Sequence, residues 1–103
     1  MIKVNVKYNN DNVYELVIKG HSGYDVHGRD IVCAAVSSMA ITTINNIIAL
    51  DNDSIDYEEK SGLLIIRVKR DTEVNNKLLD NLVRMLTELK DLYPKNIEIR
   101  NED

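Results

Sequence analysis

The stretch that begins at Ile31 constrains the fold more than any other, because its apolar side chains recur at the spacing of an α-helix. Further apolar residues fall outside that stripe, so the helix is expected to be buried over much of its circumference. Asp30 is a suitable N-cap, and Asp51 begins the polar segment that ends the helix. The stripe is Val32, Val36, Met39, Ala40, Ile44 and Ile47, and the other apolar residues are Ala34, Ala35, Ile41 and Ile48. A helix of this kind must bury these side chains against other elements, and the neighbouring segments predict a sheet.

The flanking segments supply strands for that sheet. Residues 2–8 alternate apolar and polar side chains, and a turn of Asn and Asp at 9–12 leads to a second strand at 13–19, so we expect a β-hairpin. Residues 54–59 alternate as well. Residues 63–69 start with four consecutive apolar residues, which predicts a central strand covered on both faces.

A second helix is predicted after Asp71 or Thr72, either of which can cap it, and Tyr93-Pro94 ends it. A short last strand follows at 96–100. The predicted apolar stripe of this helix is Val74, Leu78, Leu82, Met85, Leu89 and Leu92.

This order, ββαββα with a terminal strand, predicts one α+β domain over residues 1–103, with a mixed β-sheet and two helices. A chain of 103 residues is long enough for one modest core and too short for two. If the helices leave a sheet face partly open, a homodimer would cover it.

The composition bears on where the protein acts and on what it binds. No apolar run approaches the roughly 18 residues of a membrane span, and the N-terminus alternates like a strand, so we expect no membrane association and no export signal. A single cysteine cannot form an intramolecular disulfide, which favours a cytoplasmic location. The formal net charge of -4 argues against direct nucleic-acid binding and is compatible with a basic partner.

The candidate functional stretch is 20–38, which holds three of the four glycines, both histidines and the only cysteine. Cys33 is expected in or near the first turn of the helix, where the helix dipole and unpaired amides favour a reactive thiolate. His21 and His27 lie on the preceding loop. A cysteine nucleophile with a histidine base is the leading interpretation, and amides near Cys33 could form an oxyanion hole.

The roles within this stretch are unequal. His21 follows a strand, which fixes its backbone, so it is favoured over the mid-loop His27 as general base. Asp30 either orients a histidine or caps the helix, and capping is favoured. Asp25 is an alternative orienting residue with no better support. Ser37, one turn after Cys33, could border the pocket, although plain helix packing is favoured. The loop glycines could make a flexible lid over the thiol; they are Gly20, Gly23 and Gly28.

Two other chemistries use the same residues. The histidines, Cys33 and Asp30 include zinc donors, but their spacing matches no compact structural zinc site, so no metal or cofactor is expected. Residues 20–23, Gly-His-Ser-Gly, form a GxxG such as KH domains use to clamp RNA. The alternative to an enzyme is therefore a non-catalytic ribosome-associated or RNA-binding factor that uses this glycine-rich loop.

The stretch resembles the signature of the ribosomal-processing cysteine proteases called Prp. The resemblance rests on Gly-His-Ser-Gly at 20–23 and on Gly-x-Asp-Ile-Val-Cys-Ala-Ala-Val-Ser at 28–37, and it extends over the whole chain in length and element order. The motif's histidine is His21 and its cysteine is Cys33, with Ser22 where alanine is often found.

The resemblance implies a cysteine endopeptidase. It would remove the N-terminal extension of a large-subunit ribosomal protein, number twenty-seven, by a Cys–His mechanism during ribosome maturation. It also implies a homodimer with a flexible loop over the site, and it leaves open whether Asp30 caps or catalyses.

Overall fold

The structure is a computed structural model that describes residues 1–26 and 29–102. Its elements follow the predicted order, with boundaries that differ from the prediction by one or two residues. They are β1 (Ile2–Asn9), β2 (Asn12–Lys19), α1 (Ile31–Leu50), β3 (Ile55–Lys60), β4 (Leu63–Val68), α2 (Glu73–Leu92) and β5 (Ile97–Glu102).

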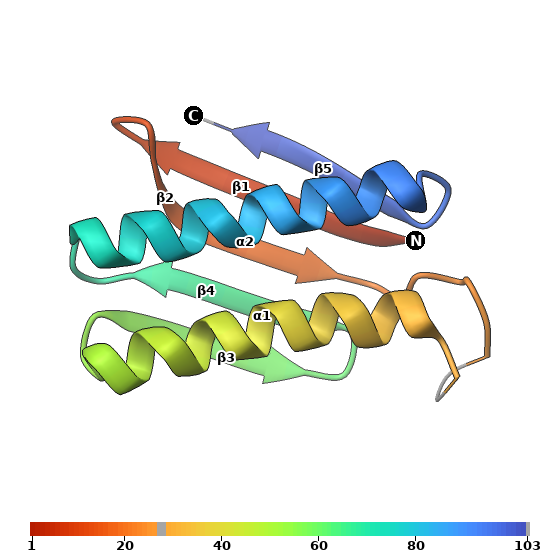
Figure 1. The fold of residues 1–103 in the computed structure, drawn as a ribbon, viewed down its shortest axis with the longest axis horizontal. Helices are drawn as coiled ribbons and strands as arrows, with labels where there is room; N and C mark the ends of the chain where they lie inside the picture. The colour runs from red at the N-terminus through yellow and green to blue at the C-terminus, as the bar shows by residue number, and fades with distance from the viewer. Residues whose placement is uncertain (27–28, 103) are drawn as a thin grey trace.

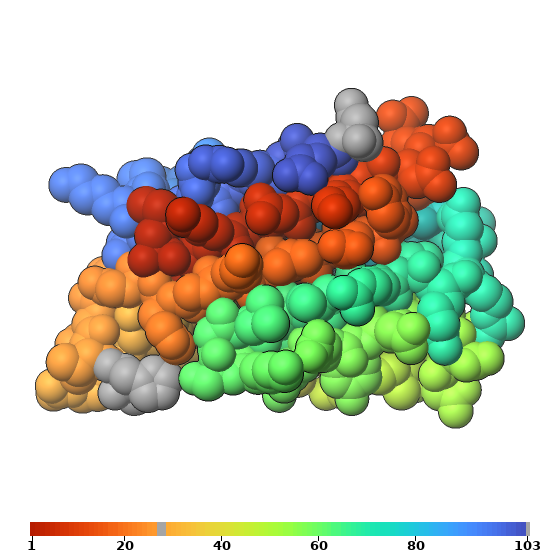
Figure 2. All heavy atoms as spheres, turned by 180° about the vertical axis from the view of Figure 1, so that it is seen from behind, coloured from red at the N-terminus to blue at the C-terminus, as the bar shows by residue number. Residues whose placement is uncertain are grey.

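The five strands form one mixed sheet in the order β3-β4-β2-β1-β5. The β1–β5 pair is parallel and the other pairs are antiparallel. Asn10 and Asp11 make the predicted β1–β2 turn with positive φ angles, which these two residue types tolerate. Both helices cross the same face of the sheet (Figure 1), and the opposite face carries no helix (Figure 2). The α+β prediction of one mixed sheet with two helices is confirmed.

Helix α1 packs on the sheet through one side, which is Val32, Val36, Ala40, Thr43, Ile44 and Ile47. The expectation that it is buried over much of its circumference was wrong for the single chain, because Ala34 and Ile41 outside the stripe are exposed. Its length of 20 residues and mean hydropathy of 1.7 over an 18-residue window would suffice for a membrane span. The sequence-based statement that no apolar stretch approaches that length was therefore wrong. Core helices of folded domains meet the same criterion, and α1 contributes five residues to the hydrophobic core.

Helix α2 is rotated relative to the predicted stripe. Val74, Met85 and Leu92 are exposed, and the buried residues are Asn75, Leu79, Leu82 and Leu86. The helix has two adjacent apolar ridges that share Leu82. The ridge with Leu79 and Leu86 faces the sheet, and the predicted ridge does not. Thr72 is its N-cap, as one of the two alternatives predicted.

Strand β4 is interior in the sheet, as predicted, but it is not covered on both faces. Leu64 and Ile66 are buried beneath the helices, whereas Leu63 and Ile65 are half-buried on the open face. Two helices of 20 residues cover only one face of the five-stranded sheet. The apolar side chains of β4 that point to the other face, Leu63 and Ile65, therefore have no helix over them.

The topology brings four separate segments to one end of the molecule. The end of β2, the start of α1, the β3–β4 turn and the α2–β5 turn all lie at this end (Figure 1). Gly20 begins the β2–α1 loop with a φ of +91°. A Cβ there would lie 2.6 Å from the carbonyl oxygen of Met1, so the chain needs glycine at this position.

Candidate active site

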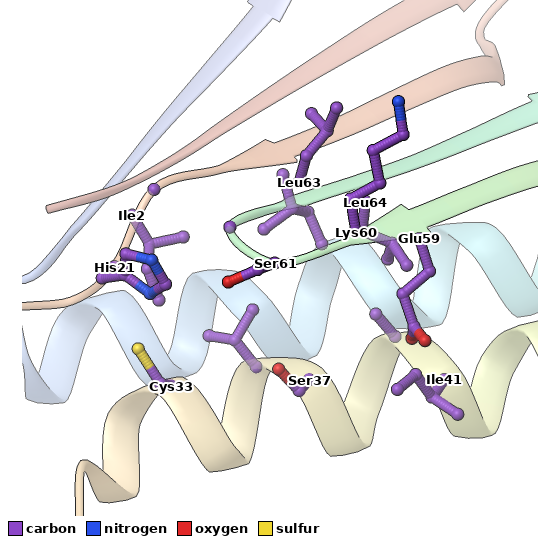
Figure 3. Close-up of a pocket in the computed structure, with 15 residues that line it drawn as sticks. Ile2, His21, Cys33, Ser37, Ile41, Glu59, Lys60, Ser61, Leu63 and Leu64 are labelled. Carbon is purple, nitrogen blue, oxygen red and sulfur yellow. The ribbon is translucent and has the colours of Figure 1, made fainter. Parts of the chain in front are cut away.

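Cys33 and His21 line the same cavity of about 520 Å³ at this end of the sheet. Cys33 is the third residue of α1 and is half-buried, and His21 directly follows Gly20 after β2. The imidazole ring of His21 lies above the sulfur of Cys33 (Figure 3). The structure thus brings together the two residues predicted as nucleophile and general base.

The sulfur of Cys33 receives a backbone hydrogen bond from the loop. The amide N–H of Ser22 donates to Cys33 Sγ over 3.2 Å. This bond fixes the sulfur relative to the loop. Since His21 and Ser22 are neighbours, one short segment presents both the imidazole and this amide to the thiol.

Asp30 caps the helix that carries the thiol. Its Oδ1 accepts hydrogen bonds from the amides of Val32 and Cys33, each over 3.0 Å, and its backbone carbonyl accepts from the amide of Ala34. The predicted capping role is confirmed. The amides of Val32, Cys33 and Ala34 are therefore already bonded in this structure, and an oxyanion hole formed by amides near Cys33 stays a prediction.

The second oxygen of Asp30 organises the loop. Oδ2 accepts a hydrogen bond from the hydroxyl of Ser22, and it accepts from the amides of Tyr24 and Asp25 over 3.1 and 3.3 Å. One buried carboxylate thus ties the start of α1 to the segment that positions His21.

These contacts lower the pKa of Asp30 from 3.8 to about 2. Burial raises this pKa, but the hydroxyl of Ser22 and the amides of Cys33, Asp25 and Tyr24 favour the ionised form and outweigh burial.

Three further residues singled out in the sequence lie around the candidate site. Ser37 lines the larger cavity one turn after Cys33, which was the less favoured of its two predicted roles. Gly20 lines it as well, and Gly23 lines an adjoining cavity. His27 and Gly28 lie outside the described residues, so a role for His27 and a lid that includes Gly28 stay predictions.

Sequence reasoning missed Gly62, which adjoins the predicted base. Its carbonyl accepts the amide N–H of Gly20 over 2.9 Å, which ties the β3–β4 turn to the end of β2. Its φ is +71°, and a Cβ there would lie 3.2 Å from Nε2 of His21. The sequence signalled only a turn, because the contact joins residues 41 positions apart.

The structure gives no support to the other chemistries that the loop suggested. Among residues 1–26 and 29–102, no group of three His, Cys, Asp or Glu side chains is placed to hold a metal ion. Ser22, inside the GxxG, is 2% exposed, with its amide on Cys33 and its hydroxyl on Asp30. Its polar groups are therefore not presented outward to an RNA backbone.

The chain matches the family of the cysteine protease Prp over residues 1–98. It belongs to the Prp family. The Prp of Mycoplasma genitalium, a ribosomal processing cysteine protease, is 30% identical over 104 residues, covering 99% of this chain and 97% of that protein. The Prp of Staphylococcus aureus is 28% identical over 103 residues, covering 96% and 97%. The family resemblance is confirmed, and the protein is a cysteine protease.

Solved Prp structures share the fold. The S. aureus Prp with a covalently linked product peptide superposes with a TM-score of 0.92 at 26% identity, covering 99% of this chain and 100% of that one. The S. aureus Prp with a substrate peptide gives a TM-score of 0.80 at the same identity and coverage.

The lowered pKa of Asp30 predicts a specific acid sensitivity. A carboxylate with a lowered pKa in the folded state adds stability above the unfolded value of 3.8, and this is lost as the pH falls toward about 2. Urea unfolding at a series of pH values should show the wild type losing stability over that interval. Asp30→Asn should be less stable near neutral pH and lose less across the interval. Parallel curves for the two proteins would contradict this role of Asp30.

Two glycines with the same backbone geometry test the packing against His21. Gly62→Ala and Gly23→Ala both place a side chain at a positive φ, +71° and +70°, so each should cost about 1 kcal/mol in stability. Only at Gly62 would the new Cβ press on His21; at Gly23 it meets no atom within 4 Å. Peptidase activity should therefore fall roughly tenfold or more for Gly62→Ala and much less for Gly23→Ala. Equal losses would show that the contact with His21 is unimportant.

Proposed function

We propose that this protein removes the N-terminal extension of ribosomal protein number twenty-seven of the large subunit, with Cys33 as nucleophile and His21 as general base. The observation that carries the proposal is the shared cavity, in which the imidazole lies above a sulfur that also receives the Ser22 amide. Membership of a family of ribosomal processing cysteine proteases supports the substrate class.

The proposed reaction is acyl transfer through a thioester. His21 takes the proton from the thiol as Sγ attacks the scissile carbonyl carbon. The C–N bond then breaks, and His21 returns the proton to the leaving amine, which becomes the N-terminus of the mature protein. Water activated by His21 hydrolyses the thioester, which releases the N-terminal peptide and restores the thiol.

The cavity is suited to an extended peptide with apolar side chains. It runs from His21 and Cys33 along α1, between this helix and the β3–β4 hairpin, toward Ile41 and Glu59 (Figure 3). Its walls include Val36, Leu64 and other apolar residues. The S. aureus relatives were solved with product and substrate peptides, which supports a peptide ligand here. The net charge of -4 favours a basic ribosomal protein.

Cleavage of the precursor tests the assignment. Cys33→Ala and His21→Ala should each lower the cleavage rate by at least about 10³-fold, because nucleophile and base act as a unit. Ser38→Ala, an exposed change on the same helix, should cleave at close to the wild-type rate. The products should be followed by mass spectrometry. A wild-type rate for either Cys33→Ala or His21→Ala would refute the assignment.

We further propose that the protein acts in the cytoplasm as a homodimer in which α1, and not the open face of the sheet, lies in the interface. The exposed positions of α1 carry no charged residue, and they include Ile31, Ile41 and Leu50 among the exposed large apolar side chains. An uncharged outward helix side is favourable to cover with a second copy. The resemblance to Prp supports the same assembly, and the single cysteine fits a reducing compartment.

Analytical ultracentrifugation checks this assembly. The wild type should sediment as a dimer at micromolar concentration. Asn45→Arg, on the exposed side of α1, should raise the dimer dissociation constant roughly tenfold or more by burying a charge. Asn81→Arg makes the same change on the exposed side of α2 and should have little effect. A monomeric wild type would overturn the homodimer, and equal effects of both substitutions would exclude α1 from its interface.

A further inference from the structure

The turn between α2 and β5 reaches the loop that carries the candidate base. The side-chain amide Nδ2 of Asn96 donates a hydrogen bond to the backbone carbonyl of Ser22 over 3.0 Å. Close by, the rings of Tyr93 and Tyr24 meet edge to face, with centroids 5.3 Å apart and planes at 84°. Residues more than 65 positions apart in sequence are thus joined twice at the same place.

Asn96 is itself held in position by the main chain. Its amide N–H donates to the carbonyl of Tyr93 over 3.0 Å, and its carbonyl accepts the amide N–H of Ile2 over 2.8 Å. The first contact closes the turn after α2, and the second fixes the turn to the start of β1. The Asn96 side chain therefore projects toward the loop from a backbone that is bonded on both sides.

Asn96 binds the backbone carbonyl of Ser22, whose amide and hydroxyl are already engaged by other residues. The Ser22 amide donates to Cys33 Sγ, its hydroxyl donates to Asp30, and its carbonyl accepts from Asn96. Amide and carbonyl flank the same Cα, so a bond that fixes the carbonyl restricts the rotation that aims the amide. Loss of the Asn96 bond would also leave the carbonyl of a residue that is 2% exposed without this donor.

We propose that Asn96 is a positioning residue for the thiol, acting through Ser22. Its carboxamide holds the Ser22 amide on the sulfur of Cys33 and thereby fixes His21, the residue before Ser22. This inference rests on the proposed chemistry of Cys33 and His21, but its effect on the thiol can be measured without any substrate.

Asn96→Asp is the most informative variant, because it keeps the shape of the side chain and replaces the donor by an acceptor facing a carbonyl oxygen. Asn101→Asp is the matched control, since it adds the same charge at an exposed position of β5. Two rates should be measured: alkylation of Cys33 by iodoacetamide near neutral pH, and cleavage of a precursor peptide resolved into kcat and KM.

For Asn96→Asp we expect both the alkylation rate and kcat to fall about tenfold or more, with KM changed less than about twofold. Asn101→Asp should match the wild type in all three. Hydrogen exchange at the Ser22 amide should be faster in Asn96→Asp at a similar thermal midpoint, which separates positioning from general destabilisation. If Asn96→Asp reduces folding too far, Asn96→Ser, a milder loss of the same donor, replaces it in the same assays.

The outcomes separate this inference from the proposed function. Slower alkylation of Asn96→Asp in a protein whose wild type fails to cleave the precursor would support the positioning role and refute the substrate. An Asn96→Asp protein with the alkylation rate and kcat of Asn101→Asp would overturn the positioning role, whatever the substrate. A rise in KM alone would overturn it as well, because that result assigns Asn96 to peptide binding.

Discussion

The buried carboxylate of Asp30 connects the two halves of the candidate active site. One oxygen caps the helix that carries Cys33, and the other gathers the loop that carries His21. A negative charge at the start of α1 is favourable because the helix dipole is positive there. The relative position of the two halves depends on this side chain and its donors, together with the contacts that Gly62 and Asn96 make with the loop.

The capping by Asp30 determines which backbone donor reaches the thiol of Cys33. A helix N-terminus could offer its first amides to a thiolate or to an oxyanion, but here Asp30 accepts those of Val32 and Cys33. The donor that reaches the sulfur comes instead from Ser22 on the loop. In the proposed mechanism, activation of Cys33 therefore depends on how well the loop is placed, and the loop is supported from outside by Gly62 and Asn96.

The fold was largely predictable because its information is local. Alternation in β1 and β2, the turn at Asn10 and Asp11 and the helical spacing from Ile31 each act over a few residues. The rotation of α2 was not predictable in this way. The apolar residues of α2 make two adjacent ridges. The polar side chain of Asn75 can be buried because it donates a hydrogen bond to the carbonyl of Arg70. Only the position of the sheet selects between the ridges.

The candidate site was predictable where its residues are close together in the sequence. His21, Cys33 and Asp30 fall in one short stretch, so residue types and spacing sufficed to single them out. Gly62 and Asn96 touch that stretch from distant parts of the chain, and their residue types are ordinary for turns. Their role comes from tertiary contact, for which a single sequence carries no signal.

The most direct measurement is the intact mass of the protein, quenched in acid during turnover of a ribosomal protein precursor. We expect an adduct on Cys33 whose mass equals the N-terminal fragment less one water, as a thioester requires. It should be absent from Cys33→Ala. Cleavage at the same site by the wild type, with no such adduct at any quench time and with Cys33→Ala equally active, would rule out Cys33 as the nucleophile.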